Sequence, residues 1–142
     1  HLEKIPTWRS LEVAKAAQLV QHSADGSAYA QWEDRARALA SALTGEVHAG
    51  LACKWSDRRE PQARALTTAA GRQLGADWTA TDKGAAHDWT VAEWLVAHSY
   101  DYGIVAVPAQ GQRWTAKSGH WRPDTRAGAA ATYLLAKPTK PS

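Results

Sequence analysis

Two tryptophan–arginine pairs have the residue types and spacing of a ligand-binding surface. Arg113-Trp114 and Trp121-Arg122 lie in a polar segment that contains turn-forming glycines and, between the pairs, Lys117 and His120. Sugar rings stack on exposed indoles, and guanidinium groups pair with carboxylates or phosphates. These six residues are therefore predicted to form a binding surface. In the alternative interpretation, both indoles pack against a sheet and belong to the core.

The histidines and acidic residues do not match a known metal-binding pattern. His87 and His98 share a helix at a spacing of roughly 16 Å, which is too far for one ion to bridge. Asp77, His87, Asp88 and His120 are the remaining candidates for zinc ligands, and their spacing fits known zinc sites poorly. The sequence therefore predicts no bound metal and no cofactor.

No catalytic nucleophile is indicated either. Cys53 is the only cysteine, which excludes an intrachain disulfide and a cysteine-based zinc site. No serine lies in a Gly-x-Ser-x-Gly context. Glu33 is expected to pair with Arg37 on a solvated helix face rather than to act as an acid catalyst. The chain is therefore predicted to contain no complete catalytic site.

The composition limits the class of protein. A chain of 142 residues, with 44% hydrophobic and 22% charged residues, can bury a real core. The net charge of +3 comes from basic residues spread along the chain, which argues against nucleic acid and suits an anionic polymer. No apolar run approaches the ~18 residues that span a bilayer, and any export signal is expected upstream of His1.

Hydrophobic periodicity predicts two helices at the start of the chain. Apolar residues recur at helical spacing over residues 11–22 and again over 29–43. Val13, Ala17 and Val20 form an apolar face on the first helix. We expect this face to be covered by another part of the protein or by a partner.

The elements that hold the tryptophan–arginine pairs come later. Before the pairs, the pattern predicts a strand over 46–55 and a helix that begins at Pro61, carries an apolar stripe over 65–74 and is closed by Gly75. A short strand over 78–81 follows, and then a helix that begins at Asp88 or Thr90 and ends at Gly103. The strands 104–107 and 113–115 and a turn at 110–112 form a hairpin, and a last strand covers 129–136. This order predicts an α+β fold, with a small, mostly antiparallel sheet covered by helices and preceded by the two N-terminal helices.

The opening residues resemble a known family. Residues 16–23, Ala28-Tyr29-Ala30 and Glu33 resemble the end of the lysozyme-like, transglycosylase-type domain of actinobacterial secreted proteins. A Val-Pro-Gly-Trp-like turn precedes this helix in the family, and Ile5-Pro6-Thr7-Trp8 is similar to it, with threonine in place of the glycine. Gly26-Ser27 stands where the family usually has a proline.

The rest of the chain resembles the small C-terminal domain of the same proteins, which are often labelled heavy-metal transporters. The similar segments are 91–98, 102–104, 111–115 and Trp121-Arg122. The transporter label is unsupported, because the chain has no spanning segment. The domain is also distantly similar to zinc-dependent D-alanyl-D-alanine carboxypeptidases, whose last strand carries a His-x-His pair, but residues 129–135 contain no histidine here.

The resemblance implies three parts: terminal helices of a lysozyme-like domain (1–44), an α+β domain (45–136) and a flexible tail (137–142). The catalytic acid of the lysozyme-like domain would lie upstream. The chain is thus expected to be a non-catalytic, extracytoplasmic accessory module, secreted or anchored through an upstream segment, that binds peptidoglycan or another anionic wall polymer. A protein-interaction module of a cell-envelope or conjugative assembly, and a degenerate hydrolase, stay open as alternatives.

Overall fold

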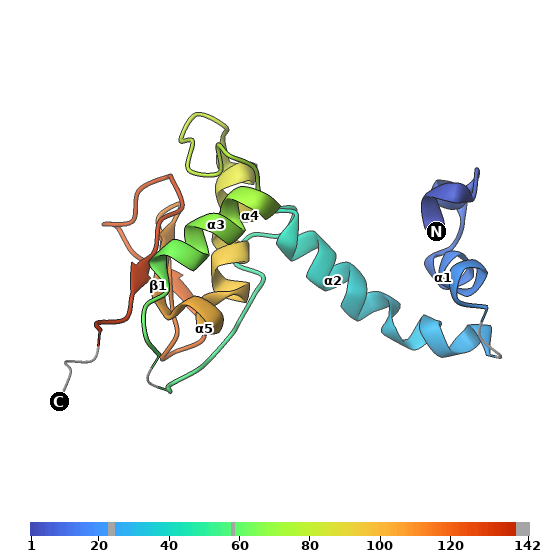
Figure 1. Cartoon of the computed structure of the whole chain (residues 1–142), viewed down its shortest axis with the longest axis horizontal. Helices are drawn as coiled ribbons and strands as arrows, with labels where there is room; N and C mark the ends of the chain where they lie inside the picture. Colours follow the sequence, from blue (N-terminus) through green and yellow to red (C-terminus); the bar gives the residue numbers. More distant parts are fainter. Residues whose placement is uncertain (23–24, 58, 139–142) are drawn as a thin grey trace. The chain divides into compact units, whose positions relative to one another are not determined.

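The computed structural model describes residues 1–22, 25–57 and 59–138, and most of the predicted tail 137–142 lies outside them. The chain divides into two compact units, His1–Ala40 and Ser41–Ser142 (Figure 1). Within the described residues, no helix is both long enough and apolar enough to cross a membrane.

The first unit is helical, as predicted. Single 3₁₀ turns at Leu2–Lys4 and Trp8–Ser10 precede helix α1 (Val13–Gln21), and a 3₁₀ segment, Gly26–Trp32, leads into α2 (Glu33–Leu43). The helix predicted over 29–43 is therefore α-helical only from Glu33. Alanine, arginine and leucine dominate α2, whereas the 3₁₀ segment contains glycine, serine and aromatic residues, which have lower helix propensity.

Three helices of the second unit flank its sheet. These are α3 (Ala63–Gln73), α4 (Ala85–Ala97) and the single turn α5 (Ser99–Tyr102), which Gly103 ends in the left-handed conformation. Helix α4 is buried along most of its length and packs against strand β1. Neither Asp88 nor Thr90 caps it, contrary to the prediction: the helix starts one turn earlier, after Gly84.

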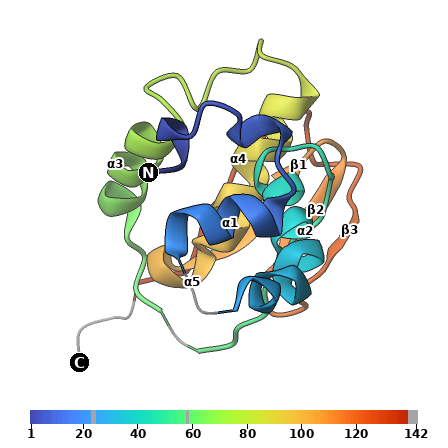
Figure 2. The same ribbon diagram turned by 90° about the vertical axis from the view of Figure 1, so that its right-hand side faces the viewer.

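In the described part of the chain, one antiparallel sheet runs in the order β3-β2-β1-β4. Its strands are β1 (Ile104–Ala109), β2 (Gln112–Thr115), β3 (Trp121–Pro123) and β4 (Leu134–Leu135), and Figure 2 shows the first three side by side. Gln110 and Gly111 both have positive φ, as a two-residue type I′ hairpin requires, so the predicted hairpin is confirmed. Strand β3 was not predicted, and the strand predicted over 129–136 is reduced to β4.

The segment 46–55 is not a strand, which corrects the prediction. Its side chains do alternate from Ala49 to Trp55, with the odd-numbered residues packed against the core. Its backbone, however, has other partners: the N–H groups of Gly50 and Leu51 donate to the carboxylate of Glu93, and that of Trp55 donates to the carbonyl of Ala116. The alternating pattern of 49–55 therefore reflects one face that packs on the core, and the backbone of this segment does not pair with a neighbouring strand.

The short strand predicted over 78–81 is also wrong, because this segment forms turns. The N–H of Trp78 donates to the carbonyl of Gly75, and the N–H of Ala80 donates to the carbonyl of Asp77. Trp78 is nevertheless buried in the core, which lies between α3, α4 and the sheet. Apart from these local differences, the predicted α+β fold is confirmed.

Candidate functional site

The pairing of β2 with β3 separates the tryptophans of the predicted binding segment from its arginines. In this register Arg113 lies opposite Arg122, and Trp114 lies opposite Trp121. Residues directly opposite one another point to the same face of a sheet, and successive residues point to opposite faces. One face of the β2–β3 strand pair therefore carries both arginines, and the other face carries both indoles.

The indole face belongs to the core. Trp114 is 0% exposed, and its Nε1 donates to the carbonyl of Cys53 at 3.1 Å. Trp121 is half-buried and packs edge-on against Trp89, with ring centroids 5.2 Å apart. Within the described residues, the Nε1 of Trp121 is buried without a hydrogen-bond acceptor. The prediction that Trp114 stacks on a ligand is corrected, because no ligand can reach its ring in this fold.

The arginine face borders a pocket of about 240 Å³, which we call the cationic pocket. Its basic side chains come from β2, from β3 and from the residues just before and after β3: Arg113, His120, Arg122 and Arg126. The hydroxyls of Thr115 and Ser118 also line it, and their oxygens lie 2.9 Å apart. His120 and Arg122 are exposed, so solvent reaches the pocket.

Asp124 holds two of these arginines in place. Its Oδ2 accepts from the Nε of Arg113 at 2.5 Å, and its Oδ1 accepts from the Nε of Arg126 at 3.2 Å. The hydrogen bond from Arg113, followed by the backbone N–H of Arg126, lowers the pKa of Asp124 to about 2. Three guanidinium groups against one carboxylate leave the pocket positively charged at neutral pH.

Of the six predicted residues, three line the cationic pocket: Arg113, His120 and Arg122. Trp114 and Trp121 lie on the opposite face, and Lys117 lines a separate groove with Trp55 and Val105. The prediction missed Arg126 and Asp124. In the sequence, these two residues stand out only because they follow Pro123 in a turn. That pattern does not indicate that the turn folds back beside Arg113.

The four candidate zinc ligands are dispersed. Asp77 pairs with Lys83, and Asp88 accepts from the side-chain amide of Gln110 at 2.8 Å. The Nε2 of His87 lies 3.2 Å from the carbonyl of Trp78, and His120 lies at the cationic pocket. Among the described residues, no group of three histidine, cysteine, aspartate or glutamate side chains is placed to hold a metal ion.

Protein purified without added metal is expected to carry far less than one zinc per chain, because the four side chains do not converge and three of them already have other partners. Elemental analysis by mass spectrometry measures this directly, with a chelator-treated sample as the control. Stoichiometric zinc, together with cleavage of a peptidoglycan stem peptide that the chelator abolishes, would contradict the expectation that this chain contains no catalytic site.

Glu93 is a buried charged residue that the sequence analysis did not single out. It is 0% exposed on α4, and its two carboxylate oxygens accept from the N–H groups of Gly50 at 2.7 Å and Leu51 at 3.0 Å. Burial raises the pKa of Glu93, and the two backbone hydrogen bonds partly oppose this shift. The sequence signal was a glutamate in the middle of an apolar helix. Its place in the fold indicates that it anchors a loop.

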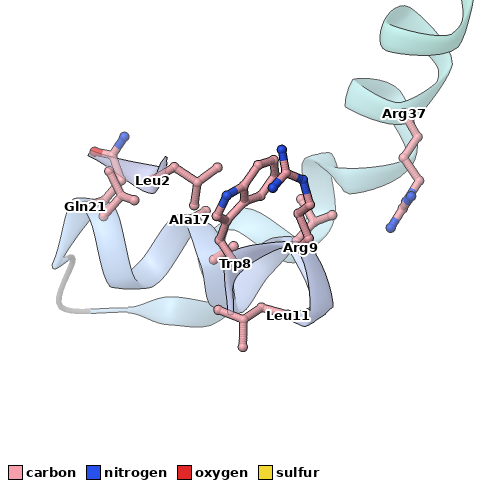
Figure 3. Close-up of a pocket in the computed structure, with 10 residues that line it drawn as sticks. Leu2, Trp8, Arg9, Leu11, Ala17, Gln21 and Arg37 are labelled. Atoms are coloured by element: carbon pink, nitrogen blue, oxygen red, sulfur yellow. The ribbon is translucent and has the colours of Figure 1, made fainter. Parts of the chain in front are cut away.

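The first unit contains an apolar pocket of about 480 Å³ (Figure 3). Val13, Ala17 and Val20, the apolar face predicted for the first helix, all line it. In Figure 3 the guanidinium of Arg9 lies beside the indole of Trp8, 4.6 Å from the ring centroid. Val13 on this apolar face of α1 is exposed. The prediction that another part of the protein or a partner covers this face therefore stays a prediction.

Comparison of the chain with family models, with curated proteins and with solved structures gives no match.

Proposed function

We propose that this chain is a non-catalytic, extracytoplasmic accessory module that binds an anionic polymer of the cell wall through the cationic pocket. The observation that carries the proposal is the convergence of Arg113, Arg122 and Arg126 beside His120 around one solvent-accessible hollow. Guanidinium groups bind carboxylates and phosphates through paired, charge-assisted hydrogen bonds. Peptidoglycan stem peptides carry carboxylates and teichoic acids carry phosphates, so both suit this pocket.

The architecture of the pocket also supports binding to a polymer. Arg113 and Arg122 project from paired strands, and Asp124 orients Arg113, so little side-chain freedom is lost on binding. Because the indoles lie on the other face, binding is expected to depend on charge rather than on sugar stacking, and to weaken as salt is added. The resemblance of the chain to lysozyme-like wall proteins supports the same assignment, with that domain upstream as the partner that the module positions.

Replacing Arg122 and Arg126 together by glutamine is expected to weaken binding to purified, insoluble cell wall roughly 2- to 30-fold. This range follows from about 0.2–1 kcal/mol for each exposed ion pair that is lost. Arg113 is left unchanged because its side chain is only 27% exposed, whereas that of Arg126, which also pairs with Asp124, is 84% exposed. The fraction of chain that pellets with the wall, measured against wall concentration, gives the affinity.

The matched control is the double variant Arg64→Gln and Arg72→Gln on α3, which removes the same charge from two exposed positions outside the pocket. It should bind the wall like the parent. An equal loss in both double variants would show that net charge alone drives pelleting, and an unchanged Arg122→Gln/Arg126→Gln variant would rule out the cationic pocket.

A second candidate function, a protein-interaction module of a cell-envelope assembly, is favoured by one further observation. Trp32 and Leu39, both in the first unit, are 53% and 54% exposed at the end of the 3₁₀ segment and on α2. Large apolar side chains exposed along a helix are typical of protein contacts. A chain that stays in solution when mixed with the wall, yet binds envelope proteins in a manner that Trp32→Ser and Leu39→Ser abolish, would favour this function over the first.

A further inference from the structure

A groove of about 780 Å³ lies in the second unit and shares no lining residue with the cationic pocket. Its walls come from the loop at Trp55, from strand β1, from the residues after β2 and from β4. We call it the apolar groove, after its apolar lining residues: Trp55, Val105, Ala116, Leu134, Leu135 and Ala136. Its volume is in the range of small-molecule binding sites, roughly 300–1,000 Å³.

Three N–H groups of residues that line the apolar groove already donate to partners within the protein. The backbone N–H of Trp55 donates to the carbonyl of Ala116 at 3.1 Å, and its indole N–H donates to the hydroxyl of Ser99 at 2.9 Å. The N–H of Ala136 donates to the carbonyl of Gly103 at 2.8 Å. A peptide that binds here would lose hydrogen bonds between its backbone and water and would form few with the protein in return. A hydrocarbon chain makes no hydrogen bonds with water, so it loses none on binding. The lining therefore favours a hydrocarbon chain.

The rim of the apolar groove is positively charged. Arg59, Lys117 and Lys137 lie there with a single carboxylate, that of Asp57. The guanidinium of Arg59 lies 3.9 Å from the ring centroid of Tyr100, and its Nε donates to the carbonyl of that residue. Within the described part of the chain, no ion pair neutralises Lys117 or Lys137. The uncompensated charge is complementary to an anionic head group.

We propose that the apolar groove binds one linear amphiphile, with a hydrocarbon chain and a carboxylate head, as a monomer from solution. The chain lies on Trp55, Val105 and Leu135, and the carboxylate pairs with the two lysines of the rim. A monomer fits better than a bilayer surface because the apolar side chains line a hollow and do not form a projecting face. The proposal does not depend on wall binding, because the two sites share no residue.

The test is calorimetric titration of the whole chain with octanoate, decanoate and dodecanoate, each below its micelle concentration. Affinity is expected to rise on the order of tenfold for each added pair of buried methylene groups. Charge reversal at the rim, Lys117→Glu with Lys137→Glu, is expected to weaken dodecanoate binding at least tenfold and to leave binding of its neutral methyl ester within about twofold. The matched control reverses two exposed arginines of α3 in the same unit that do not line the groove, Arg64→Glu with Arg72→Glu, and should bind dodecanoate like the parent.

Four results would overturn the proposal. The first is an affinity that does not change with chain length, and the second is equal loss of binding in both double variants. The third is binding to anionic phospholipid vesicles without binding of monomeric dodecanoate, which would indicate a membrane surface instead. The fourth is tighter binding of an acidic, leucine-containing peptide than of dodecanoate, which would assign the groove to a protein partner.

Discussion

Replacing Trp114 by alanine is expected to lower the free energy of unfolding by about 3–5 kcal/mol. The ring of Trp114 is wholly buried on β2, directly opposite Val107 of β1. Its removal leaves a cavity in the middle of the core and leaves the carbonyl of Cys53 without the indole N–H that it accepts. This is a large fraction of the stability of a domain of this size.

Denaturant-induced unfolding, followed by circular dichroism, measures the change. The matched control is Trp32→Ala, which removes an indole that is 53% exposed and is expected to change the free energy of unfolding by less than about 1 kcal/mol. A Trp114→Ala variant that unfolds at the same denaturant concentration as the parent, but no longer pellets with cell wall, would contradict the buried position and restore Trp114 as a binding residue.

Replacing Glu93 by glutamine is expected to lower the free energy of unfolding by about 1–3 kcal/mol. The carboxylate receives two backbone N–H donors, one on each oxygen, from Gly50 and Leu51. Glutamine offers a single acceptor oxygen, so one buried N–H would face the NH₂ group and lose its partner. Alanine should be more disruptive, because it removes both acceptors and leaves a cavity.

The matched control is Glu46→Gln, an exposed glutamate in the same unit whose Oε2 accepts from the hydroxyl of Ser41. Glutamine can keep that hydrogen bond through its remaining oxygen, so little change is expected. Hydrogen exchange should show increased exchange at Gly50 and Leu51 in Glu93→Gln and parent-like exchange in the control. Unchanged protection of these two amides in Glu93→Gln would show that Glu93 does not anchor this loop.

The elements that depend on nearby residues were predictable from the sequence. The helix predicted between Pro61 and Gly75 appears as α3, and Gly103 ends the helical segment before β1 as expected. The turn at Gln110 and Gly111 joins β1 and β2 as predicted. Helix periodicity, left-handed caps and hairpin turns are set by side chains within a few positions of one another, so a single sequence contains the information.

The segment 46–55 shows where local patterns are insufficient. Alternation correctly indicated which of its side chains face the core from Ala49 onward. It could not show that the backbone partner would be the side chain of Glu93, more than forty positions away, instead of a neighbouring strand. Each backbone N–H group donates one hydrogen bond, and for Gly50 and Leu51 the tertiary structure decides which acceptor receives it.

The sequence by itself predicted the strand at 113–115, in which the adjacent residues Arg113 and Trp114 point to opposite faces of the sheet. It did not predict strand β3, so only the tertiary structure placed Trp121 opposite Trp114 and Arg122 opposite Arg113. Only the tertiary structure decided which face is buried. Helix α4 packs on β1, and β1 pairs with β2, so the indole face is turned to the core and the arginine face is left to solvent. Periodicity specifies that two faces differ, whereas burial of one of them depends on contacts between elements that lie far apart in the chain.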